Sequence, residues 1–287
     1  MNKVKVIADS TIDLSPELVA QNDIEIVPLH VAFKDDLHDY HDGVDIDSET
    51  LYQKVESNGG ITPKTGAVNV AEFINVFKKF IDQGYDIIFT GIGSRLSSTF
   101  QNAVLASQEF PEGRIRVLDS DNLSTGTGLL VLKMCKFRDE GLSIDEIYDK
   151  VQPLTKLLSV KFCIDTLTYL NKGGRCSGMT MLVAHALHIH PVAKMMDGKL
   201  AVYKKPRGPY VKAVDEQLNE FMEDLPNIDK SCVFITHSGR IDGYDQYIYD
   251  KISKYIEPKN IYRTVAGCTV SSHCGPKTIG LLYLLNK

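Results

Sequence analysis

The sequence lacks the features that mark several common classes of protein. Its six cysteines form no Cys-x-x-Cys pair and no zinc-ligand spacing, and we expect them to stay reduced in a chain of 287 residues without a secretory segment. No run of 18 apolar residues is present, so no membrane-spanning helix is expected. The net charge of −5 lacks the basic excess typical of nucleic-acid-binding proteins. Together these absences favour a cytoplasmic globular protein.

Catalytic and nucleotide-binding motifs are also missing. No Gly-x-Ser-x-Gly elbow is present, which argues against an α/β-hydrolase. No phosphate-binding Gly-x-x-x-x-Gly-Lys-Ser/Thr loop occurs either. Gly91-Ile92-Gly93 lacks the third glycine of a dinucleotide fingerprint, because residue 96 is leucine. We therefore expect no cofactor and no catalytic activity in the chain by itself.

Two histidine-containing segments have to be weighed as metal sites. The stretch 38–47 contains two histidines and several aspartates, but it lacks the carboxylate spacing of a calcium loop. His185, His188 and His190 span the predicted end of a helix and the start of a strand, so they need not share a face. Solvated or capping roles are favoured for both groups, and no metal site is predicted.

The order of predicted elements indicates an α/β protein with two domains. In the first half, short apolar runs typical of buried parallel strands alternate with helical patterns. After a linking helix over 143–158, the pattern changes to the strands of a mixed sheet, with a hairpin at Asp197-Gly198. We predict a three-layer α/β/α domain with a parallel sheet over 1–158 and a mixed α/β domain over 159–287. The strands are expected at 3–9, 24–29, 87–90 and 115–118, then at 160–166, 191–195, 199–204, 232–236 and 262–265, and the first helices at 47–57, 70–84 and 97–110.

Small polar side chains gather where the predicted parallel strands end. The segment FTGIGSRLSSTFQNA carries four hydroxyl residues between a strand and a helix, namely Ser94, Ser97, Ser98 and Thr99. One serine is enough to cap a helix, and the surplus suits an anion held at the helix N-terminus. Residues 9–11 and 119–120 end two further strands at the same predicted edge, where open parallel sheets bind ligands. Both interpretations, capping and anion binding, remain open.

A histidine and two basic segments complete the candidate residues. His273 precedes Cys274-Gly275-Pro276 and an apolar run that we expect to be a helix. It is either a turn histidine bonded to nearby backbone, or a group that donates to an anion or exchanges protons. Residues 62–66 are expected to be a loop, and surface solubility is the usual explanation for the cations of 173–175 and 204–208.

The chain resembles the DegV family of bacterial fatty-acid-binding proteins over essentially its whole length. Seven segments carry the resemblance in the family's order: DST, PKTG, GIGSRLSSTFQNA, DSDNLSTGTG, LTYLNKGGRCSG, HPVAKMMDGKL followed by Arg207, and SSHCGPKTIGL. Two segments depart from the family pattern. The usual Thr-Ser-Gln-Pro reads Thr65-Gly66-Ala67-Val68 here, and the usual Leu-Ser-Gly-Thr reads Leu96-Ser97-Ser98-Thr99.

The resemblance implies a long-chain fatty acid buried between two α/β domains. By position, Thr65 and Ser97 match the residues that bind the carboxylate, and we add Ser94 and His273 to the ligand site. Arg207 and His273 match residues tied to the step in which a separate ATP-binding fatty acid kinase converts the lipid to an acyl phosphate. The chain is expected to be monomeric by itself.

The function predicted from the sequence is therefore non-catalytic binding and presentation of a fatty acid. Two alternatives stay open. The chain could be a stand-alone acyl- or phosphoryl-transfer enzyme in which Ser97 is the nucleophile and His273 the base. It could also be a lipid carrier that has no kinase partner.

Overall fold

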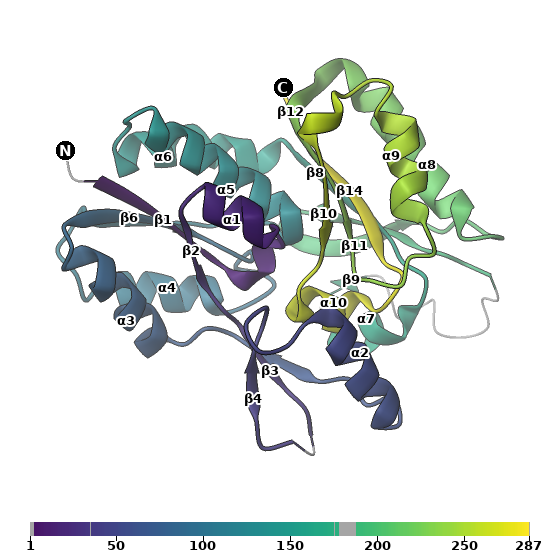
Figure 1. Cartoon of the computed structure of the whole chain (residues 1–287), viewed down its shortest axis with the longest axis horizontal. Helices are drawn as coiled ribbons and strands as arrows, with labels where there is room; N and C mark the ends of the chain where they lie inside the picture. Colours follow the sequence, from purple (N-terminus) through teal and green to yellow (C-terminus); the bar gives the residue numbers. More distant parts are fainter. Residues whose placement is uncertain (1–2, 35, 175, 178–187, 287) are drawn as a thin grey trace.

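The computed structural model describes residues 3–34, 36–174, 176–177 and 188–286 (Figure 1). Their strands form a four-stranded, a seven-stranded and a three-stranded sheet. No helix within these ranges is both long enough and apolar enough to cross a membrane. Five cysteines of the described residues are free thiols: Cys135, Cys163, Cys232, Cys268 and Cys274.

The first sheet is parallel, in the order β2-β1-β6-β7, and forms the middle of three layers. Helices α5 and α6 cover one face, whereas α3 and α4 cover the other (Figure 1). This confirms the predicted three-layer architecture. The strands are β1 (Lys3–Asp9), β2 (Ile24–Val27), β6 (Tyr85–Thr90) and β7 (Ile115–Leu118). The helices are α3 (Val70–Ile81), α4 (Thr99–Ser107), α5 (Ser124–Asp139) and α6 (Ile144–Val151).

Local sequence signals explain where the helices of this half begin. Helix α1 (Pro16–Gln21) starts after Ser15, whose side chain accepts a hydrogen bond from the Leu18 N–H. Helix α3 starts with a capping box, in which Asn69 and Glu72 each accept the other's backbone N–H. Capping therefore determines where α3 places Glu72.

The second sheet is mixed, in the order β13-β12-β14-β8-β10-β11-β9. Helices α8 (Val211–Asp224) and α9 (Tyr244–Ile252) pack on one face, and α5 of the first half packs on the other. The hairpin predicted at Asp197-Gly198 is confirmed, because both residues adopt positive φ between antiparallel strands β10 and β11. The strands are β8 (Leu158–Cys163), β9 (Cys176–Ser177), β10 (Val192–Met196), β11 (Lys199–Lys204), β12 (Ile228–His237), β13 (Ile261–Val265) and β14 (Ile279–Leu285).

Helix α5 joins the two halves, because it lies between the two sheets. Two of its glycines permit this close packing. A Cβ at Gly126 would lie 2.4 Å from Val160 Cγ2, and one at Gly128 would lie 2.9 Å from the Ile12 carbonyl. The parallel sheet ends at Leu118 and the mixed sheet starts at Leu158. The domain boundary at residue 158 itself stays a prediction.

The prediction of an apolar helix after His273 is wrong. Ile279–Leu285 is strand β14, which lies between β12 and β8 with nearly every residue buried. A short apolar run has no periodicity that separates a buried strand from a buried helix. His273 lies instead in the last turn of α10 (Cys268–Cys274), just before Gly275 at a φ of 78°.

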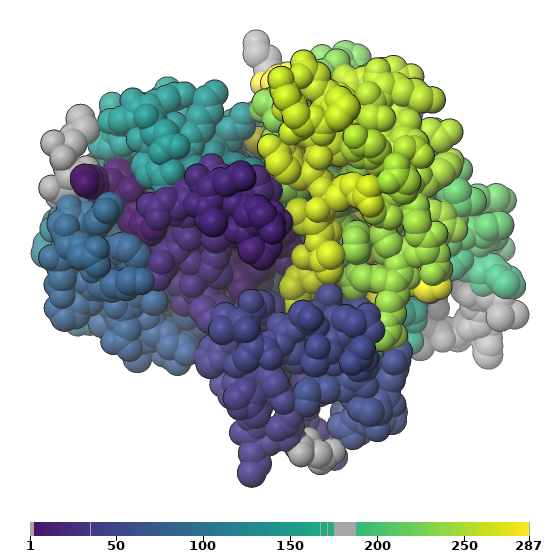
Figure 2. Space-filling model, viewed as in Figure 1, coloured from purple at the N-terminus to yellow at the C-terminus, as the bar shows by residue number. Residues whose placement is uncertain are grey.

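The three-stranded sheet, in the order β4-β3-β5, forms a small lobe with α2 (Ser48–Ser57). In Figure 2 this lobe projects below the two larger halves. Its strands β3 (His30–Ala32), β4 (Asp39–His41) and β5 (Lys64–Gly66) have three residues each, too few for a recognisable alternation. Part of the loop expected at residues 62–66 is therefore strand β5.

Candidate functional site

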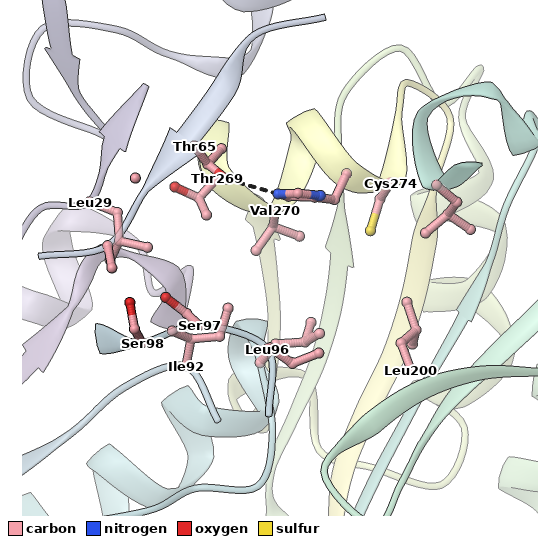
Figure 3. A pocket seen from close by; sticks show the side chains of 15 residues that line it. Leu29, Thr65, Ile92, Leu96, Ser97, Ser98, Leu200, Thr269, Val270 and Cys274 are labelled. Carbon is pink, nitrogen blue, oxygen red and sulfur yellow. Dashed lines mark hydrogen bonds between the residues drawn. The ribbon is translucent and has the colours of Figure 1, made fainter. Parts of the chain in front are cut away.

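A cavity lies between the two halves, and segments from both contribute to its wall (Figure 3). Apolar side chains make up most of that wall, and polar ones gather at one part of it. The apolar lining residues are Leu29, Ala67, Ile92, Leu96, Leu123, Leu170, Leu200 and Val270, and the polar ones include Thr65, Ser97, Ser98, Thr269 and His273. A mostly apolar cavity with a few convergent polar groups is the usual form of a ligand site.

The polar part centres on a hydrogen bond between residues that are 208 positions apart in sequence. Thr65 Oγ1, on strand β5, lies 2.9 Å from His273 Nε2, on helix α10 (Figure 3). Thr269 lies one turn before His273 on the same helix and also lines the cavity. Its buried hydroxyl has no hydrogen-bond partner within the described part of the chain. An unsatisfied buried hydroxyl is unfavourable, so this arrangement suits a polar ligand group.

Gly173 packs directly against the ring of His273. A Cβ built on Gly173 would lie only 2.3 Å from His273 Nδ1 and 3.2 Å from Cγ. Real Cβ atoms do not approach other atoms so closely, and Gly173 is therefore required by the position of the imidazole. Helix α7 (Leu167–Gly173) ends at this glycine.

The hydroxyl segment between β6 and α4 supplies a helix cap, and two of its serines also line the cavity. Ser97 Oγ accepts a hydrogen bond from the Thr99 N–H at 3.3 Å and lies 2.9 Å from Thr99 Oγ1. Ser97 and Ser98 both line the cavity. Ser94 does not line it, and its N–H donates to Asp119 Oδ1. Ser97 thus caps the first turn of α4 while facing the cavity.

Two buried aspartates of the first half hold the helix that carries His273. Asp42 accepts the Cys268 N–H at 2.6 Å and the Thr269 N–H at 3.0 Å. Asp13 Oδ1 accepts the Gly267 N–H at 2.8 Å, and its Oδ2 accepts from Ser124 Oγ. Burial raises the pKa of Asp13 to about 8, against the lowering effect of these hydrogen bonds. The backbone N–H groups at the start of α10 therefore donate hydrogen bonds to side chains from the other half of the chain.

The remaining predicted residues lie elsewhere. Arg207 is exposed in the segment after β11 and does not line the cavity. His190 pairs with Asp165 at 3.2 Å, and His188 adopts a φ of 63°. His185 lies outside the described residues.

Sequence reasoning missed Thr269 and Gly173 as parts of the site. A threonine inside an apolar segment has no local signal for ligand binding. The glycine pair 173–174 was noted only for the cation beside it, and it did not indicate packing against a histidine 100 residues away.

Comparison with known proteins agrees with this geometry. Residues 3–286 match the family model described as "Uncharacterised protein, DegV family". A DegV domain-containing protein of Clostridium perfringens is 31% identical over 288 residues, 99% of each chain. A DegV family protein of Thermus thermophilus, described by its fatty acid binding, superposes with a TM-score of 0.90 and 27% identity, over 99% of this chain and 100% of that one. A stearic-acid-binding protein of Eubacterium ventriosum gives a TM-score of 0.83 and 25% identity, over 100% and 99%.

Proposed function

Because the chain belongs to the DegV family, we propose that it binds one long-chain fatty acid between its two halves. The observation that carries the proposal is the cavity wall, which is apolar except for the cluster around Thr65 and His273. An acyl tail requires such an apolar wall, and a carboxylate requires donors at one end. Two similar proteins of known structure, one of them a DegV family protein, are described as binding fatty acids.

The tail supplies most of the affinity in this proposal. Burial of each methylene contributes roughly 0.8 kcal/mol, so about fourteen of them contribute on the order of 11 kcal/mol before ordering costs. The hydroxyls and the imidazole contribute less energy and set the orientation. Thr65, Thr269 and His273 hold the carboxylate, and Ser97 joins them from the helix α4 side.

We extend the proposal to presentation of the carboxylate to a separate ATP-dependent fatty acid kinase. Phosphoryl transfer needs nucleotide, Mg²⁺ and a phosphate cradle, and the sequence contains no recognisable cradle. In this proposal the partner supplies them, and the protein acts in the cytoplasm, where ATP is present. Arg207 is exposed outside the cavity and is the proposed contact with this partner.

A stand-alone enzyme receives less support from the hydrogen bonds. Nucleophilic catalysis requires the nucleophile and its base to lie within hydrogen-bonding reach. Ser97 Oγ instead pairs with Thr99 Oγ1, and His273 Nε2 pairs with Thr65 Oγ1. This arrangement favours binding over transfer by Ser97.

Two measurements test the proposal. Extraction of the purified protein should yield about one fatty acid per chain by mass spectrometry, and stripped protein should rebind palmitate or oleate. Absence of both would refute the lipid site. Incubation with ATP and fatty acid should give acyl phosphate only when a fatty acid kinase is added. Turnover without the kinase would favour the enzyme, and bound lipid without turnover would favour the carrier.

A further inference from the structure

The small lobe brings together two histidines and a glutamate that the proposed lipid site does not use. His30, His41 and Glu72 each offer one ligand atom, and these atoms all lie within 4.8 Å of one another. Among the described residues this is the group whose donors could hold a metal ion. Sequence analysis predicted no metal at the stretch 38–47, which contains His41, because the stretch lacks the carboxylate spacing of a calcium loop.

The backbone explains why the three side chains meet. His30 on β3 stands directly opposite His41 on β4 in the antiparallel register. Directly opposed residues of antiparallel strands point to the same face of the sheet. Their rings are accordingly 5.2 Å apart between centroids. Glu72 reaches the same place from helix α3, where the capping box with Asn69 fixes its position.

The donor atoms already approach a metal-binding geometry. His30 Nε2 lies 3.0 Å from Glu72 Oε1. Two ligands of a tetrahedral zinc ion lie about 3.3 Å apart, given bonds of about 2.0–2.1 Å. Glu72 Oε2 lies 3.1 Å from His30 Nε2 and also accepts the Asn69 N–H at 2.8 Å, so a metal would bind Oε1, the oxygen that the helix cap does not use.

A second carboxylate supports each histidine. His30 Nδ1 lies 2.8 Å from Asp39 Oδ2, and His41 Nδ1 lies 3.5 Å from Asp45 Oδ2. Metal-ligating histidines characteristically donate their other ring N–H to a carboxylate, which fixes the tautomer and orients the ring. In His30 this arrangement leaves Nε2, the nitrogen beside Glu72, as the ligand.

The surroundings admit a cation. His30, Asp39 and Lys64 line an open groove next to the cluster, so solvent reaches the donors. Three carboxylates, those of Asp39, Asp45 and Glu72, face the two imidazoles. A divalent ion would balance this negative charge, and Lys64 is the cation that lies nearby on the same groove.

We infer that His30, His41 and Glu72 form a binding site for a divalent transition-metal ion of the zinc type, with solvent completing the coordination. Two imidazoles and one carboxylate suit zinc rather than Mg²⁺ or Ca²⁺, which prefer oxygen ligands. The ion would join strands β3 and β4 to helix α3. The inference is independent of the proposed lipid function.

The test is a titration of chelator-treated full-length protein with Zn²⁺ by calorimetry, repeated with Co²⁺ by visible absorption. We expect one equivalent that is lost in His41→Ala, and a cobalt spectrum typical of mixed nitrogen and oxygen ligands. Asp39→Asn should weaken binding by about tenfold or more, as removal of supporting carboxylates does at other metal sites. Excess Mg²⁺ should not displace the zinc.

Two further variants keep the test specific. His38→Ala removes a histidine of the same segment that lies 3.5 Å from Asp45 but belongs to no donor group, and it should bind zinc within about twofold of wild type. Glu72→Gln preserves the capping box, since glutamine also completes it, yet should weaken binding. Retention of the zinc equivalent in both His41→Ala and Glu72→Gln would overturn the site. Equal losses in His38→Ala and His41→Ala, or displacement by Mg²⁺, would overturn it as well.

Discussion

Substitution of Gly173 by alanine tests the packing around His273. The added Cβ would lie 2.3 Å from His273 Nδ1, whereas ordinary contacts begin at 3.4 Å. The imidazole must therefore move by about 1 Å. The Thr65–His273 hydrogen bond, at 2.9 Å, cannot absorb such a movement in either direction. The structure thus predicts that Gly173→Ala breaks this bond.

The expected magnitudes follow from that loss. A lost hydrogen bond between side chains costs about 0.5–1.5 kcal/mol of stability, and one to a charged carboxylate costs about 1.5–3 kcal/mol. Fatty acid affinity should therefore fall by about 10- to 100-fold. Alanine is favoured over glycine by about 0.5–1 kcal/mol in a helix interior, and the gain is smaller at Gly173, the last residue of α7. Without the clash, the same substitution in α7 would stabilise the protein.

A double-mutant cycle separates the two effects. Unfolding by urea and displacement of a fluorescent fatty acid would be measured for wild type, Gly173→Ala, His273→Ala and the double variant. Alanine at 173 should destabilise the protein when the imidazole is present and stabilise it when the imidazole is absent. Effects equal in the two backgrounds, within about 0.5 kcal/mol, would refute the proposed packing.

Three further predictions concern Ser97, Arg207 and Asp13. Ser97→Ala should weaken fatty acid binding by about 1–3 kcal/mol and reduce the stability of the ligand-free protein by less, as measured by titration and thermal unfolding. Arg207→Ala should keep its lipid, seen by mass spectrometry, but lose at least about tenfold of kinase-dependent turnover, equivalent to about 1.4 kcal/mol. Burial raises the pKa of Asp13 from 3.8 to about 8, so the folded chain holds a proton there that the unfolded chain releases between these values. Stability from this group is therefore lost as the pH rises toward 8, and Asp13→Asn should flatten the decline in Tm across this range.

For each of these predictions, one result would contradict it. Equal losses of stability and binding in Ser97→Ala would indicate a helix cap and nothing more. Wild-type turnover in Arg207→Ala would remove this residue from the kinase step. An unchanged pH profile in Asp13→Asn would mean that its carboxyl is ionised throughout in the folded protein.

Local chemistry determined much of the fold. Ser15-Pro16 started α1 where the sequence predicted, because a cap and a favourable φ depend on neighbouring residues alone. Asp197-Gly198 formed its hairpin because the turn needs residues that adopt positive φ. The alternation of strands and helices likewise predicted the parallel sheet and its three layers. The cap and the turn depend on interactions within a few residues along the chain, and each strand or helix of the alternation has its own local pattern.

Elements without a local signature were missed or misassigned. Strand β14 was expected to be a helix. Its run of apolar residues is a strand because it is buried between β12 and β8, and the sequence gives no local sign of this pairing. Strands β3 and β5 exist because they pair with each other and not because of any pattern within three residues. Such short segments acquire their conformation from their neighbours in space.

In the site, too, some features follow from the sequence and others only from the tertiary structure. The sequence by itself placed hydroxyls at the end of β6 and, through its resemblance to the DegV family, indicated Thr65, Ser97 and His273. Only the tertiary structure decided that Thr65 bonds His273 across 208 residues, and that Asp42 holds the helix carrying this histidine. These contacts join segments from both halves of the chain. Their geometry depends on how the two sheets pack around α5, and no local pattern of residues encodes that packing.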